Sequence, residues 1–358
     1  MIKNYSKYFV LILIIILSLS GCLKDDVSPV YNFTLSDNAL LLHYLEQSGD
    51  YINSSDMPSV VNVDEVHNNL DNYLIIDMRK SLEYTNGHIP GALNVSNDSL
   101  ITFLSSTDLS KYPKIVLVSS DGQASSYYTC LLRLYGILNS YSLLFGMAQW
   151  NSFFSSIWTG NIGELDDSVK KDFQFGVYTN DSLSNLPNVT LTNSGLSIEN
   201  KAKKRISDII TTGFVDGDSY IKFDQPGKLL FNGEAISNFY IICYGILPFY
   251  AQNPRDPLAV GHFPDAVSFI PNESFKSTKN LQLLPDKSRI VVYGYSGQET
   301  AFVVAYLRVL GYDAKTLFYG ANNLFYSFMV DKSSAYSPFV FLSSDIRNYE
   351  YVTGSSPK

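Results

Sequence analysis

The stretch "IVLVSSDGQASSYYTCLLRLYG" at 115–136 predicts a buried β-strand that runs through a short polar loop into a helix. The apolar run ends before Ser119, turn-forming residues follow through Gly122, and apolar positions then recur at helical spacing. A second stretch, "IVVYGYSGQETAFVVAYLRVLG" at 290–311, matches the first without a gap, and both have a Gly-Gln pair in the loop. A repeat with so long a period indicates a duplicated domain rather than a solenoid.

The segments upstream of these two stretches also correspond. In the first half, "YLIIDMRKSLEYTNGHIPGALNV" at 73–95 predicts a buried strand, a short helix and a sharp turn into another strand. In the second half, "FYIICYG" at 239–245 is the strand and "GHFPDAVSFIP" at 261–271 is the turn. Strands that alternate with short helices indicate βαβ units around a parallel sheet. We therefore expect an α/β fold with two domains, each a parallel β-sheet flanked by helices on both faces.

The length and charge of the chain limit its class of function. A chain of 358 residues is long enough for two domains that each bury a core. The net charge of −8 counts against a nucleic-acid-binding protein, because phosphate contacts need concentrated Lys and Arg. The one basic cluster, "KAKKR" at 201–205, is expected to be a solvated helix face. The cysteine spacing matches no zinc site, and we expect neither a metal nor a cofactor.

The N-terminus predicts export and a lipid anchor. "MIKNYSKYFVLILIIILSLSGC" at 1–22 has lysines, then an apolar run, then small residues before Cys22, which is the plan of a secretory signal. The run is shorter than the ~20 apolar residues of a membrane span. Its end, "LSGC", resembles the bacterial lipobox, which implies acylation of Cys22 and removal of the preceding peptide. The alternative is an uncleaved membrane anchor.

Both alternatives place the rest of the chain outside the cytoplasm, attached to the membrane of the bacterial cell envelope. The three residues "KDD" at 24–26 resemble an export signal that places some lipoproteins on the cell surface. The sequence leaves the membrane and the leaflet open, with the outer membrane and the cell surface among the alternatives.

Four ordered motifs of the first half resemble the rhodanese family, the thiosulfate sulfurtransferases. They are "DMR" at 77–79, "EY" at 83–84, "GHIPGA" at 87–92 and the strand that enters a six-residue loop before a helix. The turn "LFGMAQW" at 144–150 resembles the Gly-rich turn and Trp of the same family. The resemblance covers about 59–160 and, more weakly, about 205–335, which implies a tandem rhodanese. Its motif residues are Asp77, Arg79, Glu83, His88 and His262.

The resemblance and the composition divide the chain into segments. A stretch rich in Asn, Ser and Thr at 179–195 is typical of a linker. We expect a signal peptide at 1–22, a tether and N-terminal segment at 23–58, a first rhodanese-like domain at 59–160, an interdomain linker at 161–204 and a divergent second domain at 205–345.

The resemblance also implies an active-site loop in each half. In active members a cysteine after the strand becomes a persulfide, and the loop N–H groups stabilise its negative charge. That position falls on Ser119 in the first half and on Gly294 in the second. A serine hydroxyl cannot form a persulfide, and glycine has no side chain. The two degenerate loops consist of Ser119, Ser120, Asp121, Gly122, Gln123 and Ala124, and of Gly294, Tyr295, Ser296, Gly297, Gln298 and Glu299.

The charge of both loops also differs from what an anionic sulfur donor needs. Neither loop contains Arg or Lys, and each has a carboxylate where the donor would bind. Two like charges ~4 Å apart repel by about 1 kcal/mol even in water, and by more in a partly enclosed pocket. The sequence therefore counts against a sulfurtransferase in both halves.

Histidines and cysteines elsewhere in the chain are the other candidates for a catalytic base or nucleophile. A serine nucleophile needs a base that a third group holds, and His88 and His262 lie in turns where we expect structural hydrogen bonds. Cys130 is expected to be a buried helix residue. Cys243 falls where the first half has Asp77, so a relocated thiol near the second loop stays open, although nothing nearby in the sequence would lower its pKa.

The sequence thus favours a non-catalytic, lipid-anchored tandem rhodanese-like protein that acts as a binding or interaction module. The alternative is a thiosulfate or mercaptopyruvate sulfurtransferase. A third hypothesis is a structural protein whose many Tyr and Phe side chains contact a partner. The sequence identifies neither a protein partner nor a small ligand.

Overall fold

Two parallel β-sheets, one in each half of the chain, form the framework of the protein. The computed structural model describes residues 36–178, 182–192, 195–224 and 228–356, so the predicted signal peptide and Cys22 lie outside the described residues. The first sheet has the strand order β1-β5-β4-β2-β3 and the second has the order β10-β9-β11-β12-β6. The strands of the first sheet are β1 (Val60–Val61), β2 (Leu74–Asp77), β3 (Leu93–Asn94), β4 (Ile115–Val118) and β5 (Ser140–Leu143). Those of the second are β6 (Tyr220–Ile221), β9 (Tyr240–Tyr244), β10 (Val267–Phe269), β11 (Arg289–Tyr293) and β12 (Asp313–Leu317).

The two sheets share one topology. When the second sheet is read from its other edge, β6, β12, β11, β9 and β10 follow the order of β1, β5, β4, β2 and β3. Every strand pair in both sheets is parallel. The predicted α/β fold with two parallel sheets is confirmed. A small antiparallel pair, β7 (Leu230–Phe231) with β8 (Glu234–Ala235), is an addition that the sequence patterns did not predict.

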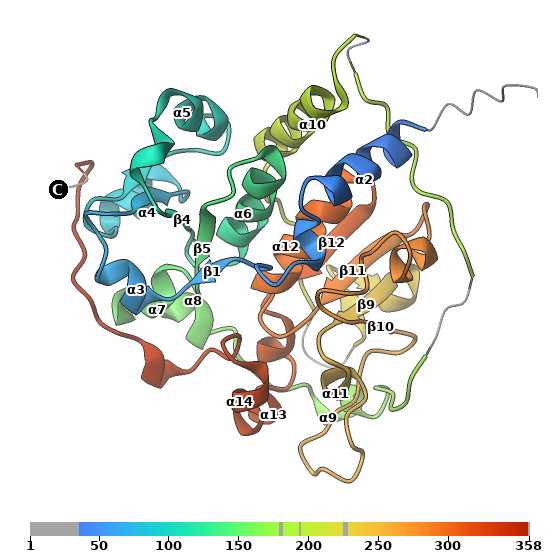
Figure 1. The fold of residues 1–358 in the computed structure, drawn as a ribbon. Coiled ribbons are helices and arrows are strands. Elements are labelled where there is room, and N and C mark those ends of the chain that lie inside the picture. The colour runs from blue at the N-terminus through green and yellow to red at the C-terminus, as the bar shows by residue number, and fades with distance from the viewer. Residues whose placement is uncertain (1–35, 179–181, 193–194, 225–227, 357–358) are drawn as a thin grey trace, which may run out of the picture. The chain divides into compact units, whose positions relative to one another are not determined.

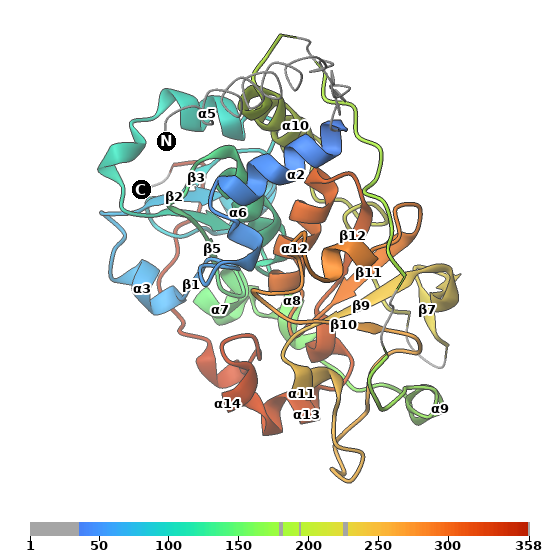
Figure 2. The same ribbon diagram turned by 45° about the vertical axis from the view of Figure 1, so that its right-hand side comes forward.

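Helices flank both sheets (Figures 1 and 2). In the first half they are α3 (Val63–His67), α4 (Ser81–Asn86), α5 (Leu100–Ser106), α6 (Gln123–Tyr135), α7 (Met147–Trp150) and α8 (Ser156–Thr159). In the second half they are α10 (Ile198–Thr212), α11 (Leu247–Tyr250), α12 (Gln298–Val309), α13 (Tyr326–Asp331) and α14 (Ser333–Tyr336). Helix α2 (Asp37–Gln47) precedes the first sheet, and α9 (Asp167–Lys170) lies between the halves.

The two halves share a hydrophobic core. Figure 1 shows α6 and α12 side by side between the two sheets. One continuous apolar cluster contains Leu117 of β4, Leu131 of α6, Val303 of α12 and Val292 of β11. Residues from Ser36 onward accordingly form one compact unit. The helices that follow the two loops therefore hold the domains together.

Two predicted connecting segments contain packed helices. Helix α2 lies in the segment 23–58, and its buried Asn38 amide donates a hydrogen bond to the Leu310 carbonyl oxygen at 2.8 Å. Helix α10 begins at Ile198, inside the predicted linker 161–204, and contributes Ile206 to the shared core. An amphipathic helix that buries its apolar face gains most of its stability from such packing. These parts of the chain therefore brace the domain interface.

The C-terminal segment 346–356 extends from the second half across the first domain (Figure 1). Val352 and His88 exchange two backbone hydrogen bonds of 2.9 and 3.0 Å. The Trp150 indole N–H donates to the Glu350 carbonyl oxygen at 2.9 Å, and the Tyr349 ring stacks on His67 with 3.8 Å between ring centroids. The predicted second domain ended at residue 345, so the sequence patterns missed this contact.

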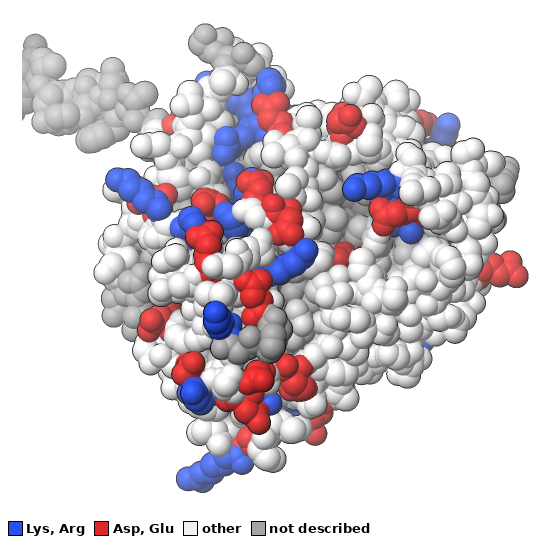
Figure 3. All heavy atoms as spheres, turned by 180° about the vertical axis from the view of Figure 1, so that it is seen from behind, with Lys and Arg blue, Asp and Glu red and all other residues white. Residues whose placement is uncertain are grey.

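The surface charges are mixed. In Figure 3, among the described residues of that face, Lys and Arg atoms alternate with Asp and Glu atoms and form no broad basic patch. On α10, Lys203 and Lys204 pair with acidic residues of the same helix and are partly exposed, as predicted. Arg205 differs, because its Nε donates to the Val309 carbonyl oxygen at 2.6 Å at the end of α12. Within the described part of the chain, none of the helices has the length and apolar character that a membrane span requires.

Candidate functional site

The first degenerate loop connects β4 to α6 and presents Ser119 at its centre. The Ser119 Oγ accepts hydrogen bonds from the backbone N–H groups of Gly122 at 3.0 Å and Ser125 at 3.3 Å. The Ser119 hydroxyl itself donates a hydrogen bond to the Ser125 Oγ at 3.2 Å. Of the described residues, only these two hydrogen-bond to the hydroxyl. Ser119 therefore lies where backbone donors converge, but no base is in contact to activate it.

The carboxylate of Asp121 is directed back into the loop. Its Oδ1 accepts from the Gln123 backbone N–H at 2.9 Å, and its Oδ2 lies 3.3 Å from the Gln123 Nε2. Burial raises the pKa of Asp121 to about 6. The Trp158 indole N–H fixes the same turn by donating to the Asp121 carbonyl oxygen at 3.0 Å. These hydrogen bonds hold the loop in one conformation. The loop contains the buried carboxyl group of Asp121 and no Lys or Arg.

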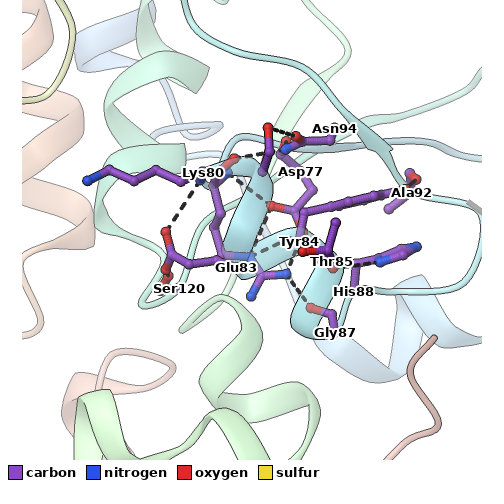
Figure 4. Close-up of polar contacts among 12 residues, drawn as sticks. Asp77, Lys80, Glu83, Tyr84, Thr85, Gly87, His88, Ala92, Asn94 and Ser120 are labelled. Carbon is purple, nitrogen blue, oxygen red and sulfur yellow. Dashed lines mark hydrogen bonds and ion pairs between the residues drawn. The ribbon is translucent and has the colours of Figure 1, made fainter. Parts of the chain in front are cut away.

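A cavity of about 230 Å³ opens beside this loop. Ser120, Arg79 and Glu83 line its polar side, and Met147, Phe153 and Phe154 line its apolar side. The Ser120 hydroxyl donates to Glu83 Oε1 at 2.9 Å, and Figure 4 shows the Glu83 carboxylate between Ser120 and the backbone of Lys80. The Arg79 guanidinium pairs with Asp77 at 2.6 Å and donates to the Gly87 carbonyl oxygen at 2.7 Å. The positive charge of Arg79 is thus already neutralised.

The second degenerate loop is filled by its own glutamate. Glu299 Oε1 accepts from the Ser296 backbone N–H at 3.0 Å, and Oε2 accepts from the Ser296 hydroxyl at 2.7 Å. A Cβ atom on Gly294 would lie 2.5 Å from Glu299 Oε1 and 2.8 Å from the Tyr244 carbonyl oxygen. Glu299 is 2% exposed, and burial raises its pKa. The position predicted for a nucleophile therefore has no room for a cysteine side chain.

The Gly-Gln pairs of the repeat link the two loops to each other. Gln298 Oε1 accepts from the Phe145 backbone N–H at 2.7 Å, and its Nε2 donates to the Gly122 carbonyl oxygen at 3.1 Å. In the opposite direction, Gln123 Oε1 accepts from the Tyr319 backbone N–H at 3.1 Å. Each loop thus sends a buried glutamine amide into the other half.

The two loop glycines make this exchange sterically feasible. Gly122 and Gly297 both have a positive φ, of +88° and +85°. A Cβ on Gly122 would lie 2.5 Å from the Gln298 Cδ, and a Cβ on Gly297 would collide with Gln123 Oε1. Only glycine combines this backbone conformation with so close an approach. The Gly-Gln pair is visible as a repeat in the sequence, and this repetition was the available signal for a contact that the sequence patterns did not predict.

Comparison with known proteins gives a family match in the first half of the chain. A family model described as "Rhodanese-like domain" matches residues 62–153. Thiosulfate sulfurtransferase GlpE of Shewanella oneidensis is 32% identical over 77 residues, which are 22% of this chain and 74% of that protein. The chain belongs to the rhodanese family.

Two solved structures are similar to this rhodanese-family chain at 15% sequence identity each. Thiosulfate sulfurtransferase from Pseudomonas aeruginosa has a TM-score of 0.28, with 78% of this chain and 46% of that chain covered. A structure described as a probable thiosulfate sulfurtransferase has a TM-score of 0.23, with 72% and 96% covered. The chain therefore spans less than half of the Pseudomonas aeruginosa protein.

The two histidines that the sequence predicted as motif residues, His88 and His262, lie in turns and are fully buried. The His88 ring stacks on Tyr84 with 3.6 Å between centroids, and its Nδ1 lies 2.8 Å from the Tyr84 carbonyl oxygen. The His262 ring stacks on Tyr250 at 4.1 Å, and its Nδ1 lies 3.0 Å from the Phe263 carbonyl oxygen. Burial lowers the pKa of His262. In both turns the ring nitrogens face backbone oxygens, and neither ring contacts the Ser119 hydroxyl.

The remaining thiols lie in the cores of the domains. Cys243 is 1% exposed, and burial raises its pKa to about 12. It lies on β9 beside Tyr293 of β11, within an aromatic cluster that includes Phe249 and Tyr250. Burial likewise raises the pKa of Cys130 well above its usual value. At neutral pH both groups are neutral thiols, whereas sulfur transfer requires a thiolate.

Proposed function

We propose that this rhodanese-family protein is a non-catalytic, lipid-anchored envelope protein with two rhodanese-like domains, in which the former active-site loops serve structure and ligand binding. The observation that carries the proposal is the position of the Ser119 hydroxyl, which accepts hydrogen bonds from the loop N–H groups at 3.0 and 3.3 Å. A neutral hydroxyl without a base in contact supplies no sulfur nucleophile at that point.

The second loop supports the same proposal independently. The Glu299 carboxylate lies 2.5 Å from where a Cβ of residue 294 would be, so the loop holds a carboxylate of its own chain. An anionic sulfur donor would have to displace this buried group. The first loop has a serine in place of a thiol nucleophile, and the Glu299 carboxylate fills the second loop. Neither loop is therefore suited to persulfide chemistry.

The contacts between the loops give them a second role. The Gln298 amide accepts from Phe145 and donates to Gly122, and the Gln123 amide accepts from Tyr319. Buried hydrogen bonds of this kind specify one arrangement of the two halves. The proposal is that both loops persist because they dock the domains, while the cavity beside Ser120 is the surface available to a ligand.

The shared strand order supports the tandem part of the proposal. The second half repeats the topology of the first, with a Gly-Gln loop at the same point of the sheet. The lipid anchor rests on the sequence, where "LSGC" ends the apolar N-terminal run. Replacing Cys22 by Ser should move the protein from the membrane fraction to the soluble fraction, and unchanged fractionation would count against the anchor.

The rival function is a thiosulfate or mercaptopyruvate sulfurtransferase, the activity that the name of the Shewanella oneidensis relative states for that protein. A thiosulfate:cyanide assay separates the two proposals. We expect thiocyanate formation by the wild type to stay at the protein-free background. Turnover that survives Ser119→Ala and disappears in Cys243→Ser would assign the reaction to the relocated thiol and refute the non-catalytic proposal.

A further inference from the structure

A second cavity, separate from both loops, lies where the first domain meets the segment after α13. Its volume is about 320 Å³. Gln149 of α7 lines one side, and Ser333, Ser334, Ser337 and Asp345 of the second half line the other. Binding sites for small molecules typically have this size and a few polar groups on an apolar wall.

The Gln149 side chain lines this cavity and has a buried polar atom without a partner. The residue is 6% exposed, and its Oε1 is buried without a hydrogen-bond partner among the described residues. Exchanging the oxygen and nitrogen of the amide would leave the same buried position unpaired. Buried amide groups in folded proteins are nearly always hydrogen-bonded. Oε1 itself is closed off by the surrounding protein, so the part of this amide that a ligand in the cavity can reach is Nε2, which makes no hydrogen bond among the described residues.

The opposite side of the cavity adds further unused groups. In the described part of the chain, no side chain or backbone group hydrogen-bonds to the hydroxyls of Ser333, Ser334 and Ser337 or to the carboxylate of Asp345. Hydroxyl and amide groups both donate and accept hydrogen bonds. The polar lining is thus suited to a ligand that carries several hydroxyl groups.

The charge and the apolar wall restrict the ligand class. Among the described residues that line the cavity, Asp345 alone is charged, and the nearby Arg347 is already paired with Asp64 at 2.8 Å, so an anion would be repelled. The neighbouring Lys332 is engaged with Asp256 at 3.0 Å and with Asp331. Leu144 and Val340 provide an apolar surface against which the C–H face of a sugar ring can pack.

We propose that this cavity binds a neutral, hydroxyl-rich ligand of monosaccharide size, with Gln149 as the central hydrogen-bonding residue. Four of the five polar residues in the lining are neutral, and the volume accommodates one sugar ring. The proposal goes beyond the function of the loops and does not depend on whether sulfur chemistry has been lost.

Saturation-transfer NMR on the full folded chain tests this proposal, with glucose, galactose, mannose and N-acetylglucosamine as probes at millimolar concentration. We expect transfer to at least one of these sugars. Gln149→Leu should weaken its affinity by about 10-fold or more, because the central hydrogen bonds are lost. Gln47→Leu is the matched control, since Gln47 is exposed on α2 far along the chain from the cavity lining.

Two further variants keep the test decisive. Ser334→Leu places a bulky side chain at the exposed rim and should abolish transfer even if Gln149→Leu fails to fold. Asp345→Asn keeps the hydrogen-bonding capacity and should change the affinity for a neutral sugar by less than about 3-fold. The proposal is overturned if none of the four sugars shows transfer, if Ser334→Leu binds normally, or if Asp345→Asn abolishes the binding of these neutral sugars.

Discussion

The hydroxyl of Ser119 accepts two backbone hydrogen bonds and donates its proton to Ser125. In this geometry its lone pairs are engaged with N–H donors, and its proton has no base to accept it. The same donors would stabilise a negative charge at this point if the residue could carry one. None of the described residues therefore activates the Ser119 hydroxyl as a nucleophile.

Asp121 predicts a pH dependence that is specific to the first loop. Its carboxyl group has a pKa of about 6 in the folded protein, compared with 3.8 when unperturbed. The folded state thus binds the proton more tightly than the unfolded state, so stability from this group is full below about pH 3.8 and is lost as the pH rises through about 6. Chemical denaturation of wild type and Asp121→Asn across this range measures the effect.

The free energy of unfolding of the wild type should fall relative to Asp121→Asn by up to roughly 3 kcal/mol over that interval. The substitution Asp71→Asn at an exposed carboxylate serves as the control and should run parallel to the wild type. Parallel curves for Asp121→Asn as well would show that the Asp121 carboxyl is not perturbed by the fold.

For individual residues, the sequence predicted the positions that differ from the family pattern but not the hydrogen bonds that the loop side chains make. Ser119 and Gly294 were located because the resemblance to the rhodanese family implies a cysteine after the strand, and the strand and loop pattern that marks this point is local. The return of Glu299 into its own loop could not be predicted, because it depends on the space that Gly294 leaves and on the Ser296 donors. Whether the Glu299 carboxylate faces solvent or the donors of its own loop depends on three-dimensional packing.

The loop elements couple the two halves of the molecule through reciprocal glutamines. Gln298 alone makes hydrogen bonds to Phe145, Gly122 and, at 3.3 Å, the Leu143 carbonyl oxygen. The strand, loop and helix of each repeat were predictable because their apolar spacing is local. The direction of each glutamine was not, since its partner lies more than 150 residues away in the sequence.

A double-mutant cycle between Gly122 and Gln298 tests this coupling. Gly122→Ala should destabilise the protein by at least about 2 kcal/mol, because the new Cβ meets the Gln298 amide in addition to the strain of its positive φ. Adding Gln298→Ala removes the clash, so the double variant should be more stable than the sum of the single effects by about 1 kcal/mol. Urea denaturation gives all four free energies.

Gly91→Ala separates the backbone strain from the clash. Gly91 has a similar φ of +82°, but a Cβ there would meet nothing within 4 Å. Its substitution should therefore cost less than that of Gly122 and should be additive with Gln298→Ala. Strict additivity for the Gly122 pair would mean that the two loops do not contact each other in solution.

At the scale of the whole molecule, shared apolar clusters and the C-terminal segment 346–356 join the two halves. The largest apolar cluster contains residues of both sheets together with α2, α6, α10 and α12. The duplicated pattern predicted two parallel sheets, but it did not predict that the segments before, between and after the domains would brace them. Which element each helix face packs against depends on tertiary packing. Backbone hydrogen bonds, such as that between Tyr349 and Trp150, leave no periodic signal in the sequence.

This shared core predicts a single cooperative unfolding transition. Differential scanning calorimetry of the purified protein should give one peak whose calorimetric and van't Hoff enthalpies agree. Separate domains joined only by a linker would give two peaks. Two resolved transitions would therefore contradict the arrangement described for α6 and α12.

The central claim of the proposal is that the family's sulfur chemistry is absent because Ser119 stands at the end of β4, where the resemblance implies a cysteine. Intact-mass spectrometry after incubation with thiosulfate tests it most directly, with Ser119→Cys as the positive control. We predict that the wild-type mass is unchanged, while Ser119→Cys gains one sulfur atom that cyanide removes, because its thiol lies among the Gly122 and Ser125 N–H donors. A cyanide-labile sulfur on the wild-type protein would contradict the account.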